Sequence, residues 1–390
     1  MRLIHTSDWH LGRTFKNVGM LGVQERALDH LVSVVASERV DAVLVSGDIY
    51  DRAVPAPDAV ALLSETLERL VDSGTQVVLS SGNHDSATRL GFAAGLLRRA
   101  GVHIASGIPD VGRLIQIGDV DVAPIPYLDP IVTADALGAA ERTHAAVLSA
   151  AMDRVRTAVS GAPLVVMAHA VVTGGDMCAS ERDISTGGLS AVPATTFSPA
   201  TYAALGHLHG AQRLGEVVHY SGSPVAMSFG EARHTKSWSV VEIEAGSAPR
   251  VERIPVPVHR ALRVLRGRID DLLGDGRFAD AEDAWCSVVL TDAVRPLGAM
   301  ERLRARFPHT IELAFEPEDV VSLDRSYASR VRGRAELDIC CDFVEHVRGG
   351  AAADDGERRL LRTALERSRS ARAVREDEGA VRALPREVSA

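Results

Sequence analysis

Asp8-Trp9-His10 closes the first apolar run of the chain, and four further motifs of the same kind follow it. These are Gly47-Asp48-Ile49-Tyr50-Asp51, Gly82-Asn83-His84-Asp85, His169 after the apolar run 163–168, and Gly206-His207-Leu208-His209. Alone, each motif has a simpler explanation as a turn, a strand end or a core histidine. Together, in this order and each after a short apolar run, they predict a two-metal site that hydrolyses phosphate esters.

Around these motifs, short apolar runs alternate with amphipathic stretches up to about residue 250. In the stretch 20–39, for example, Ala27, Leu31 and Val34 fall on one face at helical spacing. The expected strands are 2–7, 41–46, 76–81, 102–105, 113–124, 163–168, 202–205, 217–220 and 237–244, and the expected helices are 20–39, 58–72, 88–99 and 143–160. This alternation predicts an α/β layered domain with a mixed sheet over residues 1–255.

The pattern changes near Ile254-Pro255-Val256-Pro257, where we place a domain boundary. A small α+β domain is expected at 256–320, with strands at 261–268, 287–291 and 310–315 and a helix at 296–306. A helical segment at 334–370 follows, with amphipathic helices at 334–348 and 357–369 that either dock on their own domain or await a partner. The charged residues 371–390 are expected to form a flexible tail.

The motif residues are expected to converge because each follows a predicted strand, and open α/β sheets form their crevices at the carboxyl ends of strands. If Asp8 and His10 continue a strand, they point to the same side, and the same holds for His207 and His209. Mixed carboxylate, imidazole and amide-oxygen ligands suit manganese, iron or zinc better than magnesium or calcium. One carboxylate between two such groups can bridge two ions.

Composition limits the cellular compartment that we expect but does not identify the substrate. The formal net charge of −9 argues mildly against a nucleic-acid partner, but bound cations would cancel part of it. The four cysteines, Cys178, Cys286, Cys340 and Cys341, form no metal-binding or disulfide spacing, so we expect buried, reduced thiols. No apolar stretch approaches the ~18 residues of a membrane span, and the first residues do not read as a signal peptide. We therefore expect a cytoplasmic protein with no membrane partner.

The five motifs resemble those of the calcineurin-like metallophosphoesterase superfamily, and within it the chain is similar to the bacterial SbcD family of nuclease subunits. The finer resemblance rests on segments outside the metal motifs, namely 47–52 with Pro55 and Pro57, 180–189, 202–209, 220–224, 228–231 with Lys236, and 342–349. It covers the chain to about residue 370. The resemblance implies a two-sheet α/β sandwich of the calcineurin-like phosphoesterase type, with a small α+β capping domain and C-terminal helices.

The same resemblance implies roles for the motif residues. A first metal ion would be held by Asp8, His10, Asp48 and His209, and a second by Asp48, Asn83, His169 and His207, with Asp48 bridging the two. His84 would stabilise the reacting phosphate or protonate the leaving oxygen, with Asp85 orienting it. Archaeal and eukaryotic relatives carry a second active-site histidine where this chain has Asp51, so the role of Asp51 stays open.

By resemblance, the chain is a manganese-dependent DNA nuclease, a double-strand exonuclease and a single-strand and hairpin endonuclease in DNA repair and recombination. The residues 256–320 would cap the cleft and contact DNA, and 334–370 would bind an SbcC-type ATPase subunit. A homodimer within a heterotetramer would form through the helices 58–72 and 88–99. Two alternatives remain: a small-molecule or phosphoprotein metallophosphoesterase of the same superfamily, and an inactive scaffold, which would be expected to lack ligands.

Overall fold

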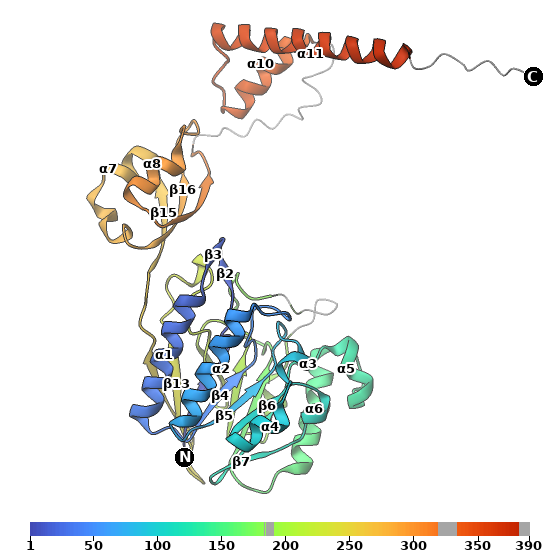
Figure 1. The fold of residues 1–390 in the computed structure, drawn as a ribbon, viewed down its shortest axis with the longest axis vertical. Helices are drawn as coiled ribbons and strands as arrows, with labels where there is room; N and C mark the ends of the chain where they lie inside the picture. The colour runs from blue at the N-terminus through green and yellow to red at the C-terminus, as the bar shows by residue number, and fades with distance from the viewer. Residues whose placement is uncertain (183, 185–190, 319–333, 382–390) are drawn as a thin grey trace, which may run out of the picture. The chain divides into compact units, whose positions relative to one another are not determined.

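The computed structural model describes residues 1–182, 184, 191–318 and 334–381, with side chains up to residue 368 (Figure 1). The chain divides into two compact units. The first comprises Met1–Val264 and Asp283–Ser287, and the second comprises Leu265–Glu282 and the residues from Val288 onward. Part of the segment 180–189 singled out in the sequence, namely residues 183 and 185–189, lies outside the described residues.

Two six-stranded sheets form the first unit, as the two-sheet sandwich predicts. The first sheet has the order β14 (Arg250–Pro255), β13 (Ser237–Glu242), β1 (Arg2–Thr6), β4 (Ala42–Ser46), β5 (Gln76–Ser80), β6 (Val102–Ala105). The second has the order β11 (Gln212–Leu214), β12 (Val218–Tyr220), β10 (Tyr202–Gly206), β9 (Leu164–His169), β8 (Val120–Pro124), β7 (Ile115–Ile117). A short hairpin of β2 (Thr14–Phe15) and β3 (Val18–Gly19) follows β1.

The central strands of each sheet are parallel and lie within the protein. In the first sheet β1, β4, β5 and β6 pair in parallel, and in the second β8, β9, β10 and β12 do. Every residue of β4 and of β9 is buried, which explains why these strands are continuous apolar runs without alternation. Side chains of both sheets, including Leu44, Val78, Met167 and Tyr202, share one apolar core. Parallel pairing places the ends of β1, β4 and β5, and of β9 and β10, at common edges.

Helices complete the first unit. These are α1 (Leu21–Glu38), α2 (Pro57–Asp72), α3 (Ala87–Leu90), α4 (Ala94–Leu97), α5 (Pro130–Leu137) and α6 (His144–Ala158), with short 3₁₀ turns η1 (Arg98–Ala100), η2 (Ile108–Asp110), η3 (Ala194–Phe197) and η4 (Phe229–Glu231). The helices α1 and α2 lie side by side, as do α5 and α6 (Figure 1). Helix α6 begins where predicted, because the hydroxyl of Thr143 caps it by accepting from Ala146 N.

The single helix predicted at 88–99 is wrong. The chain forms α3, ends it at Gly91, turns through Ala93 with φ of 58°, and then forms α4 and η1. Glycine is a poor helix former, and a left-handed residue interrupts the helical path, so the apolar spacing that predicted one helix spans two. The antiparallel strands β11 and β14 and the helix α5 are additional elements that the apolar pattern did not predict.

The second unit contains most of a three-stranded sheet of order β15 (Leu262–Gly267), β16 (Trp285–Leu290), β17 (Thr310–Phe315), whose β15 and β16 begin in the first unit. Helices α7 (Ile269–Gly274) and α8 (Ala299–Arg306) and the turn η5 (Gly276–Ala281) accompany it. Helices α10 (Glu336–Val347) and α11 (Asp355–Val381) then pack against each other (Figure 1). The expected helix end at residue 369 is wrong: α11 continues because its alanine, arginine and glutamate residues favour helix despite their charge. Residues 382–390 of the expected tail lie outside the described residues.

Two of the four cysteines are less buried than expected. All four cysteines are free; Cys286 and Cys341 are buried, whereas Cys178 and Cys340 are half-buried, which corrects the expectation that all four are buried. None of the helices among the described residues is long and apolar enough to cross a membrane.

Candidate metal centre

The structure brings the seven predicted ligands together at the carboxyl ends of five strands. Asp8 and His10 follow β1, Asp48 follows β4, Asn83 follows β5, His169 ends β9, and His207 and His209 follow β10. The loops are joined through the backbone, since Asp8 N donates to Gly47 O and His10 N donates to Asp48 O. All but Asn83 are buried, with Asp8 fully buried and Asp48 2% exposed. Burying so many ionisable groups without a compensating charge is costly.

Four of these residues adopt backbone conformations that non-glycine residues rarely take. The φ angles are 55° at Asp8, 45° at His10, 50° at Asp48 and 97° at His207. This corrects the expectation that Asp8 and His10, and likewise His207 and His209, point to one side because they continue a strand. The strands β1 and β10 end at Thr6 and Gly206, and left-handed turns aim the side chains instead. Such strain concentrates at functional sites.

Glycines in two of the motifs allow the loops that carry the candidate ligands to lie close together. A Cβ on Gly82 would collide with the carboxylate and backbone nitrogen of Asp48, and one on Gly206 would collide with Ser46 O. Gly82 and Gly206 are therefore required because the loops pack too closely to admit a Cβ, which the sequence motifs alone do not show.

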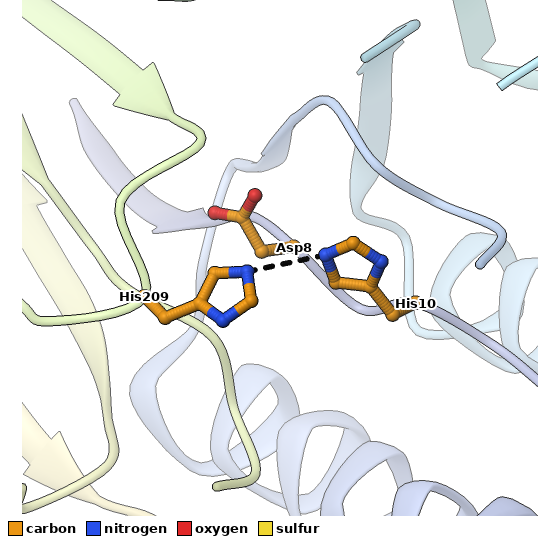
Figure 2. Close-up of side chains that lie close together, drawn as sticks. All are labelled: Asp8, His10 and His209. Atoms are coloured by element: carbon orange, nitrogen blue, oxygen red, sulfur yellow. Dashed lines mark hydrogen bonds between the residues drawn. The ribbon is translucent and has the colours of Figure 1, made fainter. Parts of the chain in front are cut away.

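One group of ligand atoms is formed by Asp8, His10 and His209 (Figure 2). The two imidazoles face each other, with His10 Nε2 lying 3.2 Å from His209 Nε2. The Asp8 carboxylate beside them accepts from Ser7 Oγ and from His207 N, at 2.5 Å and 3.0 Å, which ties the two sheets together.

The second group centres on Asp48. Its Oδ2 lies 3.5 Å from His10 Nε2 and 3.4 Å from His169 Nε2, so this one carboxylate stands between both groups. Asn83 Oδ1 lies 3.0 Å from His169 Nε2 and 3.2 Å from His207 Nδ1. Asp8 belongs both to the group with His10 and His209 and to a group with Asp48 and His169, so the two groups adjoin.

The buried charges of this cluster act strongly on one another. His169 Nδ1 donates to Ser46 O at 3.0 Å, so its Nε2 faces the Asp48 carboxylate. Burial alone would lower the pKa of His169, but the charges of Asp48 and Asp8 outweigh it and raise that pKa to about 9. Likewise, burial would raise the pKa of Asp48, yet His169, His10 and His84 hold it well below its ordinary value. The donor set of carboxylate, imidazole and amide oxygen fits divalent metal ions, as expected of this class of phosphoesterase.

His84 lies at the edge of the cluster, with its Nε2 3.9 Å from Asp48 Oδ2. Its ring Nδ1 donates to Asp51 O at 2.7 Å and its backbone N donates to Asp48 Oδ1 at 2.9 Å. Nε2 is therefore the ring nitrogen that lies outside this backbone hydrogen bond. Burial is the main reason that the pKa of His84 is lowered.

Asp85 acts differently from the expectation that it orients His84. Its carboxylate accepts from the backbone N–H groups of Ile49, Tyr50 and Gly82, at 2.9–3.0 Å, and so holds two ligand-bearing loops together. Burial, and then the charge of Asp48, raise the pKa of Asp85 to about 7. Asp51 instead lies near one candidate ligand and one arginine: its Oδ1 is 3.5 Å from His10 Nδ1 and 3.4 Å from Arg13 Nη1.

Sequence reasoning missed a buried network behind His209. Ser180 Oγ lies 2.9 Å from His209 Nδ1 and donates to Glu231 Oε1, and Lys236 Nζ donates to Glu231 Oε2. Burial would raise the pKa of Glu231, but His209 and Lys236 hold it far below its ordinary value. The available signal was the family resemblance, whose segments 180–189 and 228–231 with Lys236 contain these residues but carried no assigned role.

Comparisons with known proteins agree with this geometry. Residues 1–210, which contain all seven candidate ligands, match the family described as calcineurin-like phosphoesterase. Residues 258–348 match the SbcD_C family, described as the type 5 capsule protein repressor C-terminal domain. A solved structure, TT1561 of Thermus thermophilus, is 14% identical, covers 66% of this chain and 99% of its own, and has a TM-score of 0.41, too low to add weight.

Curated relatives, each named as the D subunit of the nuclease SbcCD, extend the match along the chain. The protein of Escherichia coli K12 is 32% identical and covers 68% of this chain and 71% of its own. That of Rhodobacter capsulatus is 36% identical, with 66% and 70% covered, and that of Bacillus subtilis is 30% identical, with 91% and 95% covered. With the ligand cluster in place and the relatives matched over most of their length, the chain belongs to the SbcD family of calcineurin-like phosphoesterases.

Proposed function

We propose that the chain is a metal-dependent nuclease that hydrolyses DNA phosphodiester bonds in the cytoplasm, working with an SbcC-type ATPase subunit. The observation that carries the proposal is the position of Asp48, whose Oδ2 lies within 3.5 Å of both His10 Nε2 and His169 Nε2. The names of the relatives, which make each of them the D subunit of a nuclease called SbcCD, support the substrate class and the partner.

Two manganese ions are the proposed cofactor. Asp8, His10, Asp48 and His209 would hold one ion, and Asp48, Asn83, His169 and His207 the other. Two ions bound there would supply Lewis acidity, which lowers the pKa of a water nucleophile and offsets the negative charge of the phosphate. The mixed nitrogen and oxygen donors suit manganese, iron or zinc, and the choice of manganese among them rests on the family resemblance.

The residues around the ions bind and transfer protons. His84, whose Nδ1 is occupied by Asp51 O, presents Nε2 to the substrate and would give a proton to the leaving oxygen. Asp85 would keep this geometry by holding the backbone of the loops after β4 and β5. Asp51 would help to orient His10, whose Nδ1 lies 3.5 Å from its carboxylate.

The remaining segments are proposed to supply the surfaces that bind DNA and the ATPase subunit. We assign residues 256–320 to capping the nuclease domain and contacting DNA, and 334–370 to binding the ATPase, supported by the family match over 258–348. Helix α10 exposes Phe343 and Val347, and α11 exposes Leu360, which are apolar positions a protein partner can cover.

A homodimer is proposed to form through α2 and the α3–α4 segment. A groove of about 540 Å³ lies between them, lined by apolar side chains such as Leu63, Leu67 and Leu90. At its rim Phe92 is 81% exposed and Leu96 is 66% exposed. Two copies of such a surface can bury each other in a symmetric interface.

The test is cleavage of a labelled DNA hairpin by the purified chain with manganese, beside the diester bis-p-nitrophenyl phosphate. His84→Ala is expected to abolish DNA cleavage. His103→Ala is the matched control, because His103 is a half-buried histidine of β6 that contacts Gln76 instead of the cluster; it is expected to cleave like the wild type.

Each other outcome overturns a defined part of the proposal. Diester hydrolysis without DNA cleavage, even with the ATPase partner and ATP supplied, would indicate a small-substrate phosphoesterase. Manganese binding without hydrolysis of either substrate would indicate a scaffold. Full DNA cleavage by His84→Ala would remove His84 from the mechanism.

A further inference from the structure

We propose that Ser180 and Glu231, with Lys236 behind them, form a positioning relay that fixes the tautomer of His209 so that its Nε2 is a metal ligand. This inference rests on the proposed metal site, and it assigns a role to residues outside the ligand set. Neither the serine nor the glutamate is itself a proposed ligand; Ser180 contacts His209 at Nδ1, and Glu231 acts through Ser180.

The argument depends on a serine hydroxyl having one proton. Ser180 Oγ lies 2.6 Å from Glu231 Oε1 and 2.9 Å from His209 Nδ1. A carboxylate can only accept, so the hydroxyl proton points to Glu231. The same oxygen must then accept from His209, which places the ring proton on Nδ1. Nε2 is left with its lone pair, directed toward His10 and Asp8.

Lys236 keeps Glu231 an acceptor. Its ammonium group donates to Glu231 Oε2 at 2.5 Å, to Ser223 Oγ at 2.9 Å and to His209 O at 2.9 Å. The Glu231 side chain is 0% exposed and that of Lys236 is 8% exposed, so water does not compete with this ion pair. Buried, fully partnered ion pairs of this kind fix orientation more than they add stability.

The backbone of His209 is held by the same arrangement. His209 N donates to Glu181 Oε1 at 2.6 Å, and its carbonyl accepts from Lys236. His209 is therefore held at its nitrogen, its carbonyl and its ring Nδ1, which leaves Nε2 as the only polar atom directed at the metal site. Residues that orient a metal-binding histidine in this way typically contribute 10–100-fold, roughly, to metal affinity.

The chain offers a matched control on the same oxygen atom. Ser228 Oγ also donates to Glu231 Oε1, at 3.1 Å. Among the described residues, however, Ser228 does not connect Glu231 to a candidate metal ligand. Replacing either serine by alanine removes one hydrogen bond to Glu231. Only Ser180→Ala interrupts the relay to His209.

The experiment measures manganese binding to the purified full chain by calorimetry, for the wild type, Ser180→Ala, Ser180→Thr and Ser228→Ala. We expect one of the two binding steps to weaken by about 10–100-fold in Ser180→Ala, and to recover in Ser180→Thr, which restores the hydroxyl. Ser228→Ala is expected to bind like the wild type. Glu231→Gln is expected to weaken the same binding step. It also leaves the buried Lys236 charge without its carboxylate partner, so the comparison of Ser180→Ala with Ser228→Ala is the decisive test.

A second readout needs no metal. Nitrogen NMR of the histidine rings distinguishes a protonated Nδ1 from a protonated Nε2, and the His209 signals are identified by their loss in His209→Gln. In the metal-free protein we expect the Nδ1–H form in the wild type and in Ser228→Ala, and a shift toward Nε2–H in Ser180→Ala.

The outcomes separate this inference from the function. If the wild type binds no manganese, the metal site fails, and the NMR result still decides whether the relay sets the tautomer. If the wild type binds manganese and Ser180→Ala binds it equally well, the relay is overturned while the metal site stands. Equal losses in Ser180→Ala and Ser228→Ala would show a merely structural role for Glu231.

Discussion

Gly206 shows how closely single residues are packed at the metal centre. A Cβ there would collide with Ser46 O and would lie 2.9 Å from His169 Nδ1. We therefore expect Gly206→Ala to lower the free energy of unfolding by about 1–3 kcal/mol in urea and to weaken manganese binding through its neighbour His207. Gly22→Ala in α1 is the control, because a Cβ there meets nothing within 4 Å; it should be neutral or slightly stabilising. Equal stability of the two variants would contradict this account.

His5 gives a pH dependence that is separate from the metal ligands. It is fully buried between the sheets, where Leu205 O accepts from Nε2 and Nδ1 accepts from Tyr202 OH, at 3.2 Å and 3.0 Å. Burial, and then the charge of His219, lower the pKa of His5 from 6.5 to about 3. The unfolded chain therefore binds this proton first as the pH falls. The stability that His5 contributes is complete above pH 6.5 and is lost between pH 6.5 and about 3.

We expect the wild type to lose about 1 kcal/mol more stability than His5→Gln does between pH 6.5 and 5.5. Glutamine keeps a donor and an acceptor at this position but does not titrate. The measurement is urea unfolding in chelator, so that the ligand histidines titrate alike in both proteins. Parallel stability curves would show that His5 is protonated in the folded state.

At the level of single residues, the sequence predicted the candidate ligands but not their geometry. Residue type and order indicated the five motifs because few side chains bind metal ions, and the family resemblance assigned Asp8, His10, Asp48 and the histidines to individual ions. The left-handed φ angles of Asp8 and Asp48 and the partners of Asp85 depend on loops that meet only in the folded chain. The spacing of residues along the sequence gives no information about contacts between loops that are distant in the chain.

At the scale of elements, α2 and the α3–α4 segment are the proposed dimer surface, and the groove between them tests it. Phe92→Asp places a charge where a second copy would bury an apolar ring, so we expect the variant to sediment as a monomer under conditions where the wild type is a dimer. Val132→Asp is the control: Val132 is 73% exposed, on α5, away from the groove. A dimer that survives Phe92→Asp would exclude this surface.

The elements that the sequence predicted correctly are those with a strong period or a buried run. Helices α1, α2 and α6 and strands β4 and β5 have such patterns. The failures have local causes: Gly91 and the left-handed Ala93 divide one predicted helix, and charged but helix-forming residues extend α11 to Val381. Short edge strands such as β11 are stabilised by their neighbours rather than by their own sequence.

For the whole molecule, periodicity indicated only a mixed α/β layer, and the two-sheet architecture came from the family resemblance. The reason is that pairings such as β1 with β13 join residues far apart in the chain, for example Leu3 with Val241, and no local pattern encodes them. The same long-range pairing gathers the ligand loops, because Asp8 and His207 become neighbours only when both sheets are complete.

The division into two units predicts how metal affects unfolding. All seven candidate ligands lie in the first unit, Met1–Val264 with Asp283–Ser287. A ligand stabilises only the unit that binds it, by about 2.7 kcal/mol for each site at a free concentration of 100 times Kd. In scanning calorimetry, manganese should therefore raise the melting temperature of one transition and leave the other unchanged, and a chelator should reverse the shift. His169→Ala is the matching control, because it removes a ligand and should abolish most of the shift without moving the second transition. A manganese-induced shift of both transitions would instead mean that the two units unfold as one cooperative block, with the metal centre stabilising the C-terminal unit through the first.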